Sequence, residues 1–186
     1  MCGIVGYAGN VRTACGKPLE VCLQGLQRLE YRGYDSAGVA LTAPGMERGA
    51  VRKKAGRLAN LVQDIERDPM PDATVGIGHT RWATNGVSNY ANAHPHTSRD
   101  GKVAIIHNGI IENYEKLKQR LEKKGYRFVS ETDTEVLAHM LTEYYRGDPV
   151  EAIEKVMHRV EGSYALGIMF LDHPHHIYAA RKDSPL

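Results

Sequence analysis

The chain opens with MCGIVG, residues 1–6, in which a cysteine in second position precedes a short apolar run. The small side chain of Cys2 favours removal of Met1 by an aminopeptidase, which would leave a thiol and a free α-amine on one carbon. The unperturbed pKa is about 8.5 for a thiol and about 8 for an α-amine, so the amine can accept the thiol proton near neutral pH. Position alone favours a cysteine buried in a first strand. The rest of the chain favours Cys2 as a nucleophile that carries its own base.

Composition sets the class of protein. The chain has 186 residues, of which 42% are hydrophobic and 25% charged, enough to bury a substantial core in one compact domain. The formal net charge is +2 with opposite charges interspersed, so no basic stripe indicates a nucleic acid partner. The longest apolar stretches, such as residues 102–111, are too short to span a bilayer, and no signal peptide is recognisable. Cys2, Cys15 and Cys22 lack CxxC spacing. We expect a cytoplasmic protein without a membrane partner.

The apolar pattern switches repeatedly between the periods of strands and helices. Short apolar runs predict strands at residues 3–8, 37–42, 75–79, 103–107, 164–170 and 177–180. Helical spacing predicts one helix from residue 19 to a stop near Gly33, a second at 114–124, a third from Thr132 or Asp133 to Gly147, and a fourth at 149–160. The mixed order and the short turns favour a single α+β domain with antiparallel strands.

Polar clusters follow two of the predicted strands. The run GHTRWATNG, residues 78–86, carries Arg81, which could clamp a carboxylate through paired, charge-assisted hydrogen bonds. The run HNG, residues 107–109, pairs the Asn108 amide with the backbone N–H of a glycine, an arrangement suited to an oxyanion hole. A third run, SETDTE at residues 130–135, could offer a carboxylate to an ammonium group.

Each cluster also has a more ordinary interpretation when taken alone. Arg81 could form a surface ion pair, Asn-Gly could be a turn, and Ser-Glu-Thr-Asp could cap a helix. Together, however, the clusters supply a nucleophile, a base, oxyanion donors, a carboxylate clamp and an ammonium partner. That set suffices to hydrolyse the side-chain amide of an α-amino acid.

The motifs resemble those of one family in their order and over most of the chain. MCGIVGY, LEYRGYDSAG, GHTRWATNG, NAHPH, HNGIIENY and SETDTEV are similar to the glutaminase domain of glutamine:fructose-6-phosphate aminotransferases, also called glucosamine-6-phosphate synthases. These are class II glutamine amidotransferases of the N-terminal-nucleophile hydrolase type. The resemblance implies a four-layer αββα sandwich of two stacked antiparallel sheets, with the catalytic cysteine at the start of a strand.

The resemblance also implies a role for each matched residue. Cys2 would attack the side-chain amide of L-glutamine and form a γ-glutamyl thioester, once Met1 is gone. Asn108, through its side chain, and Gly109, through its N–H, would stabilise the oxyanion. Arg81 would hold the α-carboxylate and Asp133 the α-ammonium.

Four further residues have supporting roles by the same resemblance. Trp82 and Thr84 would belong to a flap that closes over glutamine, and His94 would lie near the glutamine loop. Arg32 would help to order the region of the nucleophile. No cofactor is implied.

Histidine-rich runs raise the question of a metal. His94 and His96 are close in sequence, and residues 173–176 contain three more histidines. Metal is the less favoured interpretation for both, because the family places His94 near glutamine without a metal and the second run is typical of an exposed turn.

The chain departs from the family at two points. Asn85 stands where the family usually has a histidine, so flap closure could differ. The chain also ends at Leu186, whereas the family continues into two sugar-isomerase domains that bind fructose 6-phosphate. We therefore expect residues 1–186 to be a glutaminase domain without its acceptor half, taken from a longer, homodimeric enzyme and itself monomeric.

Two alternatives remain open at this point. The domain could feed ammonia to a different acceptor, as amidophosphoribosyltransferases do, or it could be a non-catalytic module that binds glutamine.

Overall fold

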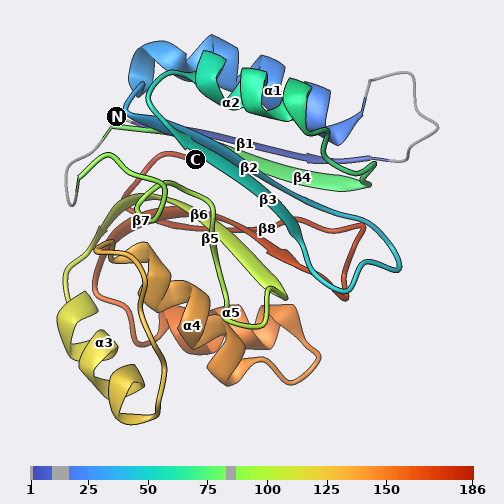
Figure 1. The fold of residues 1–186 in the computed structure, drawn as a ribbon. Coiled ribbons are helices and arrows are strands. Elements are labelled where there is room, and N and C mark those ends of the chain that lie inside the picture. The colour runs from blue at the N-terminus through green and yellow to red at the C-terminus, as the bar shows by residue number, and fades with distance from the viewer. Residues whose placement is uncertain (1, 10–16, 83–86) are drawn as a thin grey trace.

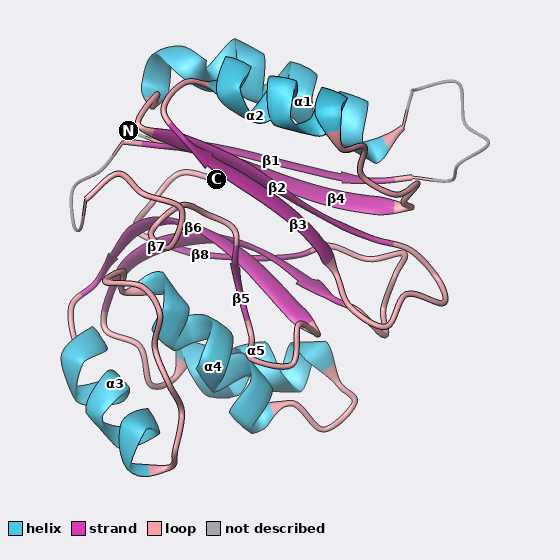
Figure 2. Ribbon diagram, in the orientation of Figure 1, coloured by secondary structure: helices cyan, strands magenta, loops and turns pink. Residues whose placement is uncertain are grey.

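The computed structural model describes residues 2–9, 17–82 and 87–186. Two four-stranded antiparallel sheets make up its centre, with strand orders β1-β4-β2-β3 and β5-β6-β7-β8, here called sheet A and sheet B. Helices α1 and α2 cover the outer face of sheet A, and α3, α4 and α5 lie on the outer side of sheet B (Figure 1). The layers therefore run helix, sheet, sheet, helix (Figure 2), which confirms the predicted αββα sandwich.

The strands of sheet A are β1 (Gly3–Ala8), β2 (Ser36–Thr42), β3 (Ala50–Ala55) and β4 (Val75–Arg81). Those of sheet B are β5 (His96–Thr97), β6 (Val103–Ile111), β7 (Gly162–Phe170) and β8 (Tyr178–Lys182). The helices are α1 (Pro18–Leu29), the short 3₁₀ helix η1 (Glu30–Arg32), α2 (Leu58–Arg67), α3 (Tyr114–Lys123), α4 (Thr134–Tyr144) and α5 (Pro149–Met157). None of the helices in the described residues is both long and apolar enough to cross a bilayer.

The core consists of three apolar layers, one between each pair of neighbouring layers of the sandwich. The layer between sheet A and its helices is close-packed because Gly78 of β4 faces α1: a Cβ there would lie 3.0 Å from Cδ1 of Leu26. The layer between the two sheets comprises Ala40, Val75, Ile77, Ala104, Ile106 and Met169. The third and largest layer joins sheet B to α3, α4 and α5.

Every predicted strand and helix is present, with shifted ends. The main difference is that β4 and β6 do not stop before the polar clusters. Arg81 pairs with Ser36 of β2, and β6 continues against β7 as far as Ile111, so residues 80–81 and 108–109 are strand residues and not loops or turns. Both strands continue through their polar residues because the backbone hydrogen bonds to the neighbouring strands do not depend on the side chains.

The sequence reasoning missed β3, α2 and β5. β3 has the sequence AVRKKA, and its three cations interrupt the apolar pattern by which a strand is recognised. Among the described strands it lies at the edge of sheet A, beside β2, where charged residues are common. The N-cap of α2 is Arg57, which makes no side-chain capping bond, so the usual start signal is absent.

Candidate active site

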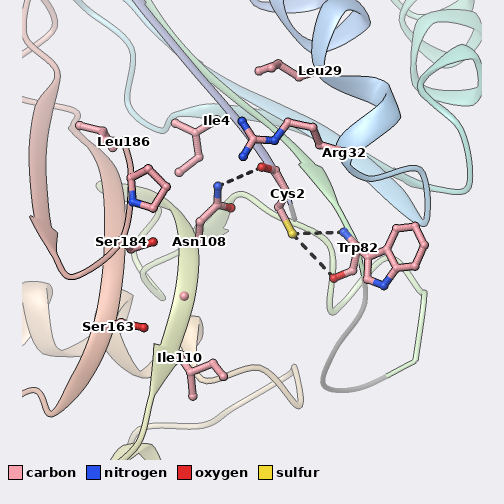
Figure 3. A pocket seen from close by; sticks show the side chains of 12 residues that line it. Cys2, Ile4, Leu29, Arg32, Trp82, Asn108, Ile110, Ser163, Ser184 and Leu186 are labelled. Carbon is pink, nitrogen blue, oxygen red and sulfur yellow. Dashed lines mark hydrogen bonds between the residues drawn. The ribbon is translucent and has the colours of Figure 1, made fainter.

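Cys2 lies at the start of β1, beside the end of β4. The register pairs Gly3 with Thr80, which brings the thiol next to Trp82. Sγ of Cys2 accepts a hydrogen bond from the Trp82 backbone N–H at 3.2 Å and lies 3.7 Å from the Trp82 carbonyl oxygen (Figure 3). The backbone of a neighbouring strand thus holds the half-buried thiol in place.

Asn108 reaches the same point from sheet B. Its Nδ2 donates to the backbone carbonyl of Cys2 at 3.1 Å (Figure 3). On the other side of the amide, Oδ1 lies 2.8 Å from Nε2 of His79 in β4. One asparagine side chain therefore bridges the two sheets beside Cys2.

Gly109, the next residue of β6, has a backbone that only glycine adopts readily. Its φ is +128°, and a Cβ would lie 2.1 Å from the carbonyl oxygen of Ser163 in β7. The absence of a side chain lets β6 stay against β7 and leaves the backbone beside the Asn108 amide unobstructed.

Arg81 and Asp133 bring opposite charges to the site. Arg81, the last residue of β4, is 5% exposed. Burial lowers its pKa, while the nearby Cys2, Asp35 and Asp133 raise it. Asp133 precedes α4, and its Oδ2 accepts the backbone N–H of Ile111 at 2.8 Å, which ties the carboxylate to the end of β6.

Two cavities meet at Cys2. The first, of about 50 Å³, is polar and lined by Cys2, Arg81, Trp82, His94, His107, Asn108, Gly109, Thr132, Asp133 and Thr134. The second, of about 520 Å³, contains Cys2, Arg32, Asn108, Ile110 and Leu186 in its wall (Figure 3). The thiol and the Asn108 amide belong to both.

Four histidines are buried around the smaller cavity, His79, His94, His96 and His107, each at most 6% exposed. Burial lowers the pKa of His79 to about 4 and that of His96 to about 3, and it also lowers the pKa of His94 and His107. All four are therefore neutral at pH 7.

Threonine hydroxyls bind three of these rings. Thr134 Oγ1 lies 2.9 Å from His94 Nε2 and 2.9 Å from His107 Nδ1, and Thr132 Oγ1 lies 3.0 Å from His96 Nε2. In the part of the chain that the structure describes, no three His, Cys, Asp or Glu side chains are grouped to hold a metal ion.

The structure brings most of the predicted site residues together. Cys2, Arg81, Trp82, His94, Asn108, Gly109 and Asp133 line the smaller cavity. Arg32 instead lines the larger cavity and not the smaller one. Met1, Cys15, Thr84 and Asn85 lie outside the described residues.

The sequence reasoning missed His79 and Thr134. Both could have been found from the pattern of their elements. Ile77, His79 and Arg81 alternate along β4 and so share the face that meets sheet B. Thr134 is the first residue of α4, directly after Asp133.

Comparisons with known proteins agree with this geometry. A sequence profile described as a glutamine amidotransferase domain matches residues 79–184. Over its whole length the chain is 53% identical to the glutamine--fructose-6-phosphate aminotransferase [isomerizing] of Caldanaerobacter subterraneus subsp. tengcongensis and 54% identical to that of Thermus thermophilus, and it spans 29% of the length of each.

A solved structure shares the fold. It is the glutamine phosphoribosylpyrophosphate amidotransferase of B. subtilis, which is 30% identical with a TM-score of 0.70 and covers 91% of this chain, while the match takes up 34% of that protein. The profile spans more than half of the chain, and the two stacked sheets are those of N-terminal-nucleophile hydrolases. The chain belongs to the family of class II glutamine amidotransferase domains.

Proposed function

We propose that this chain hydrolyses L-glutamine to glutamate and ammonia, with Cys2 as the nucleophile. The observation that carries the proposal is the hydrogen bond from the Asn108 amide to the backbone carbonyl of Cys2, at a cavity that Arg81 and Asp133 also line. Hydrolysis of the side-chain amide of an amino acid requires a nucleophile and an amide donor for the reaction, and a cation and a carboxylate to bind the α-carboxylate and α-ammonium groups.

The proposed reaction has two stages. Sγ of Cys2 attacks the amide carbon of glutamine, and its proton passes to the α-amine of Cys2, which is free once Met1 has been removed. The amine returns this proton to the departing nitrogen as the C–N bond breaks, so ammonia leaves and a γ-glutamyl thioester remains. Water then forms a C–O bond, the C–S bond breaks, and the proton returns to sulfur.

Asn108 and Gly109 are proposed to stabilise the oxyanion of each tetrahedral intermediate. One N–H of the Asn108 amide donates to the Cys2 carbonyl, and the second is available to the substrate oxygen beside the backbone N–H of Gly109. In well-studied hydrolases one such donor contributes about 3 to 4 kcal/mol to the transition state.

Charged groups are proposed to select glutamine. The Arg81 guanidinium would bind the α-carboxylate, and Asp133 the α-ammonium. Trp82, Thr84 and His94 would cover the bound substrate and limit the access of water to the thioester. Arg32 would act from the larger cavity on the region of the nucleophile. The reaction needs no cofactor.

In the longer polypeptide we propose that the ammonia converts fructose 6-phosphate to glucosamine 6-phosphate on sugar-isomerase domains that follow residues 1–186. The support is that relatives named for fructose 6-phosphate are 53 to 54% identical to this chain, against 30% for the phosphoribosyl enzyme. The same relatives are far longer than this chain. The parent enzyme is proposed to be a homodimer of the cytoplasm, where its thiols stay reduced.

Glutamate release from L-glutamine tests the proposal. The sample is this chain with its N-terminus verified as Cys2 by intact mass, and the control is Cys2→Ala. We expect release that the alanine variant abolishes. Glutamine binding without release by correctly processed protein would overturn the proposal in favour of a binding module.

A further inference from the structure

His79 is a buried group that the proposed chemistry does not use, and it contacts Asn108, the proposed oxyanion donor. It lies in β4, is 1% exposed, and faces sheet B. Its Nε2 lies 2.8 Å from Oδ1 of Asn108 and 3.1 Å from the carbonyl oxygen of His107.

The contacts of the His79 ring show which of its nitrogens carries the proton. Both partners of Nε2 are oxygen acceptors, so Nε2 carries the hydrogen and donates it to them. Nδ1 is buried and has no hydrogen-bond partner among the described residues, so a second proton there would be desolvated without compensation. His79 is therefore the neutral Nε2–H tautomer, in agreement with a pKa lowered to about 4 by burial.

This donor decides which way the Asn108 amide points. As placed, Oδ1 accepts from His79 and Nδ2 donates to the carbonyl of Cys2. A half-turn of the amide would set Nδ2 against the N–H of His79 and Oδ1 against the Cys2 carbonyl. Nδ2 and the His79 N–H would then be two donors facing each other, and Oδ1 and the Cys2 carbonyl two acceptors. An oxygen would also replace the N–H available to the oxyanion.

We propose that His79 is a positioning residue that locks the Asn108 amide with its N–H groups toward Cys2 and the oxyanion. The inference rests on the proposed glutaminase function. His79 itself lies in neither cavity wall and acts on the substrate only through Asn108.

The kinetic consequence is specific. An oxyanion exists only in the transition state and the intermediates, so loss of the lock lowers kcat and leaves KM nearly unchanged. We expect His79→Leu to lower kcat by about ten- to hundredfold, somewhat less than the loss of a whole donor. His79→Gln keeps an N–H near the position of Nε2, and we expect it to restore most of the rate.

A double-mutant cycle separates this role from a structural one. In an Asn108→Ala background there is no amide to orient, so His79→Leu should lower kcat no further. The matched control is His96→Leu. His96 is 3% exposed and bonded to the Thr132 hydroxyl, not to Asn108. Its effect should add to that of Asn108→Ala. An equally additive effect of His79→Leu would overturn the proposal.

A second measurement needs neither activity nor a variant that folds. Nitrogen NMR of histidine-labelled wild-type protein at pH 7 reports the tautomer of each ring. A neutral His79 with its proton on Nε2 supports the lock, and a proton on Nδ1 or a charged ring overturns it. If the wild-type protein releases no glutamate, the proposed function fails, and the NMR result still decides whether His79 donates to Asn108.

Discussion

The backbone N–H of Trp82 donates to the sulfur of Cys2 across 80 positions of sequence, at 3.2 Å. The contact exists because β1 and β4 are neighbours in sheet A, with Gly3 opposite Thr80. Main-chain pairing therefore fixes the position of the Cys2 thiol, the proposed nucleophile, and leaves the side chains around it available to bind substrate.

Arg81→Lys should weaken glutamine binding. Lysine keeps the charge but loses the planar pair of donors that fits a carboxylate, so we expect KM to rise about tenfold or more with a smaller change in kcat. Steady-state glutamate release measures both. Arg52→Lys is the control, because Arg52 pairs with Asp64 and Asp68 on the surface of sheet A. An unchanged KM in Arg81→Lys would contradict the assigned role.

Gly109→Ala should abolish most activity. The new Cβ would lie 2.1 Å from the Ser163 carbonyl oxygen at a φ of +128°, so β6 must move away from β7 and carry the oxyanion donors with it. We expect kcat to fall about a hundredfold or more. Gly125→Ala provides the comparison, since its φ is +86° with no atom within 4 Å of the added carbon. That variant should cost about 1 kcal/mol of stability and keep its rate. Equal activity of the two variants would refute this account of Gly109.

Acid should unfold the protein through its buried histidines. Because the folded state lowers the pKa of His79, His94, His96 and His107, the unfolded chain binds more protons between about pH 6.5 and pH 4. Stability is therefore complete above that range and falls as the pH decreases through it, by up to about 1.4 kcal/mol per pH unit for each histidine. Urea unfolding from pH 7 to pH 5 measures the slope. His96→Gln should reduce the slope by about a quarter; a flat profile in the wild type would show that these rings titrate normally.

Glu135→Gln should destabilise the protein at neutral pH. Burial alone would raise the pKa of Glu135, but the His139 ring 3.5 Å from its Oε1 and hydrogen bonds from Ser130 and the Val129 N–H outweigh it and lower the pKa to about 2. A lowered carboxyl pKa contributes stability above the unfolded value of about 4.5, and that stability is lost as the pH falls from 4.5 toward 2. We expect a loss of about 2 to 3 kcal/mol at pH 7 by urea unfolding. Glu151→Gln is the control, because its pair with Lys155 is exposed and should be worth under about 1 kcal/mol. Similar losses in the two variants would argue against the bonded carboxylate.

The family resemblance implied the αββα layers and the roles of the site residues, and apolar periodicity predicted the strands, helices and α+β class, because it reports which face of an element is buried. It failed where a polar residue is buried against a partner distant in the chain. The predicted strand ended at His79, yet β4 continues to Arg81, since polar groups of sheet B face His79 and Asp133, just before α4, lies near Arg81.

The bond between His79 and Asn108 was equally beyond reach. It depends on how sheet A stacks on sheet B, and neither the period of a strand nor the spacing of a motif contains that information. Arg32 was expected to lie near Cys2, but only the folded chain shows that it lines the larger cavity and not the smaller one.

The apolar layer between the sheets has a further consequence. The nucleophile is carried by sheet A and the Asn108 amide by sheet B, so the thickness of the layer of Ile77, Ile106 and Met169 sets the separation between them. We expect a methylene added or removed there to change the turnover rate without touching the substrate. In this fold the volume of the core would therefore affect the reaction rate as well as the stability, so selection for a well-packed interior would also be selection for catalysis.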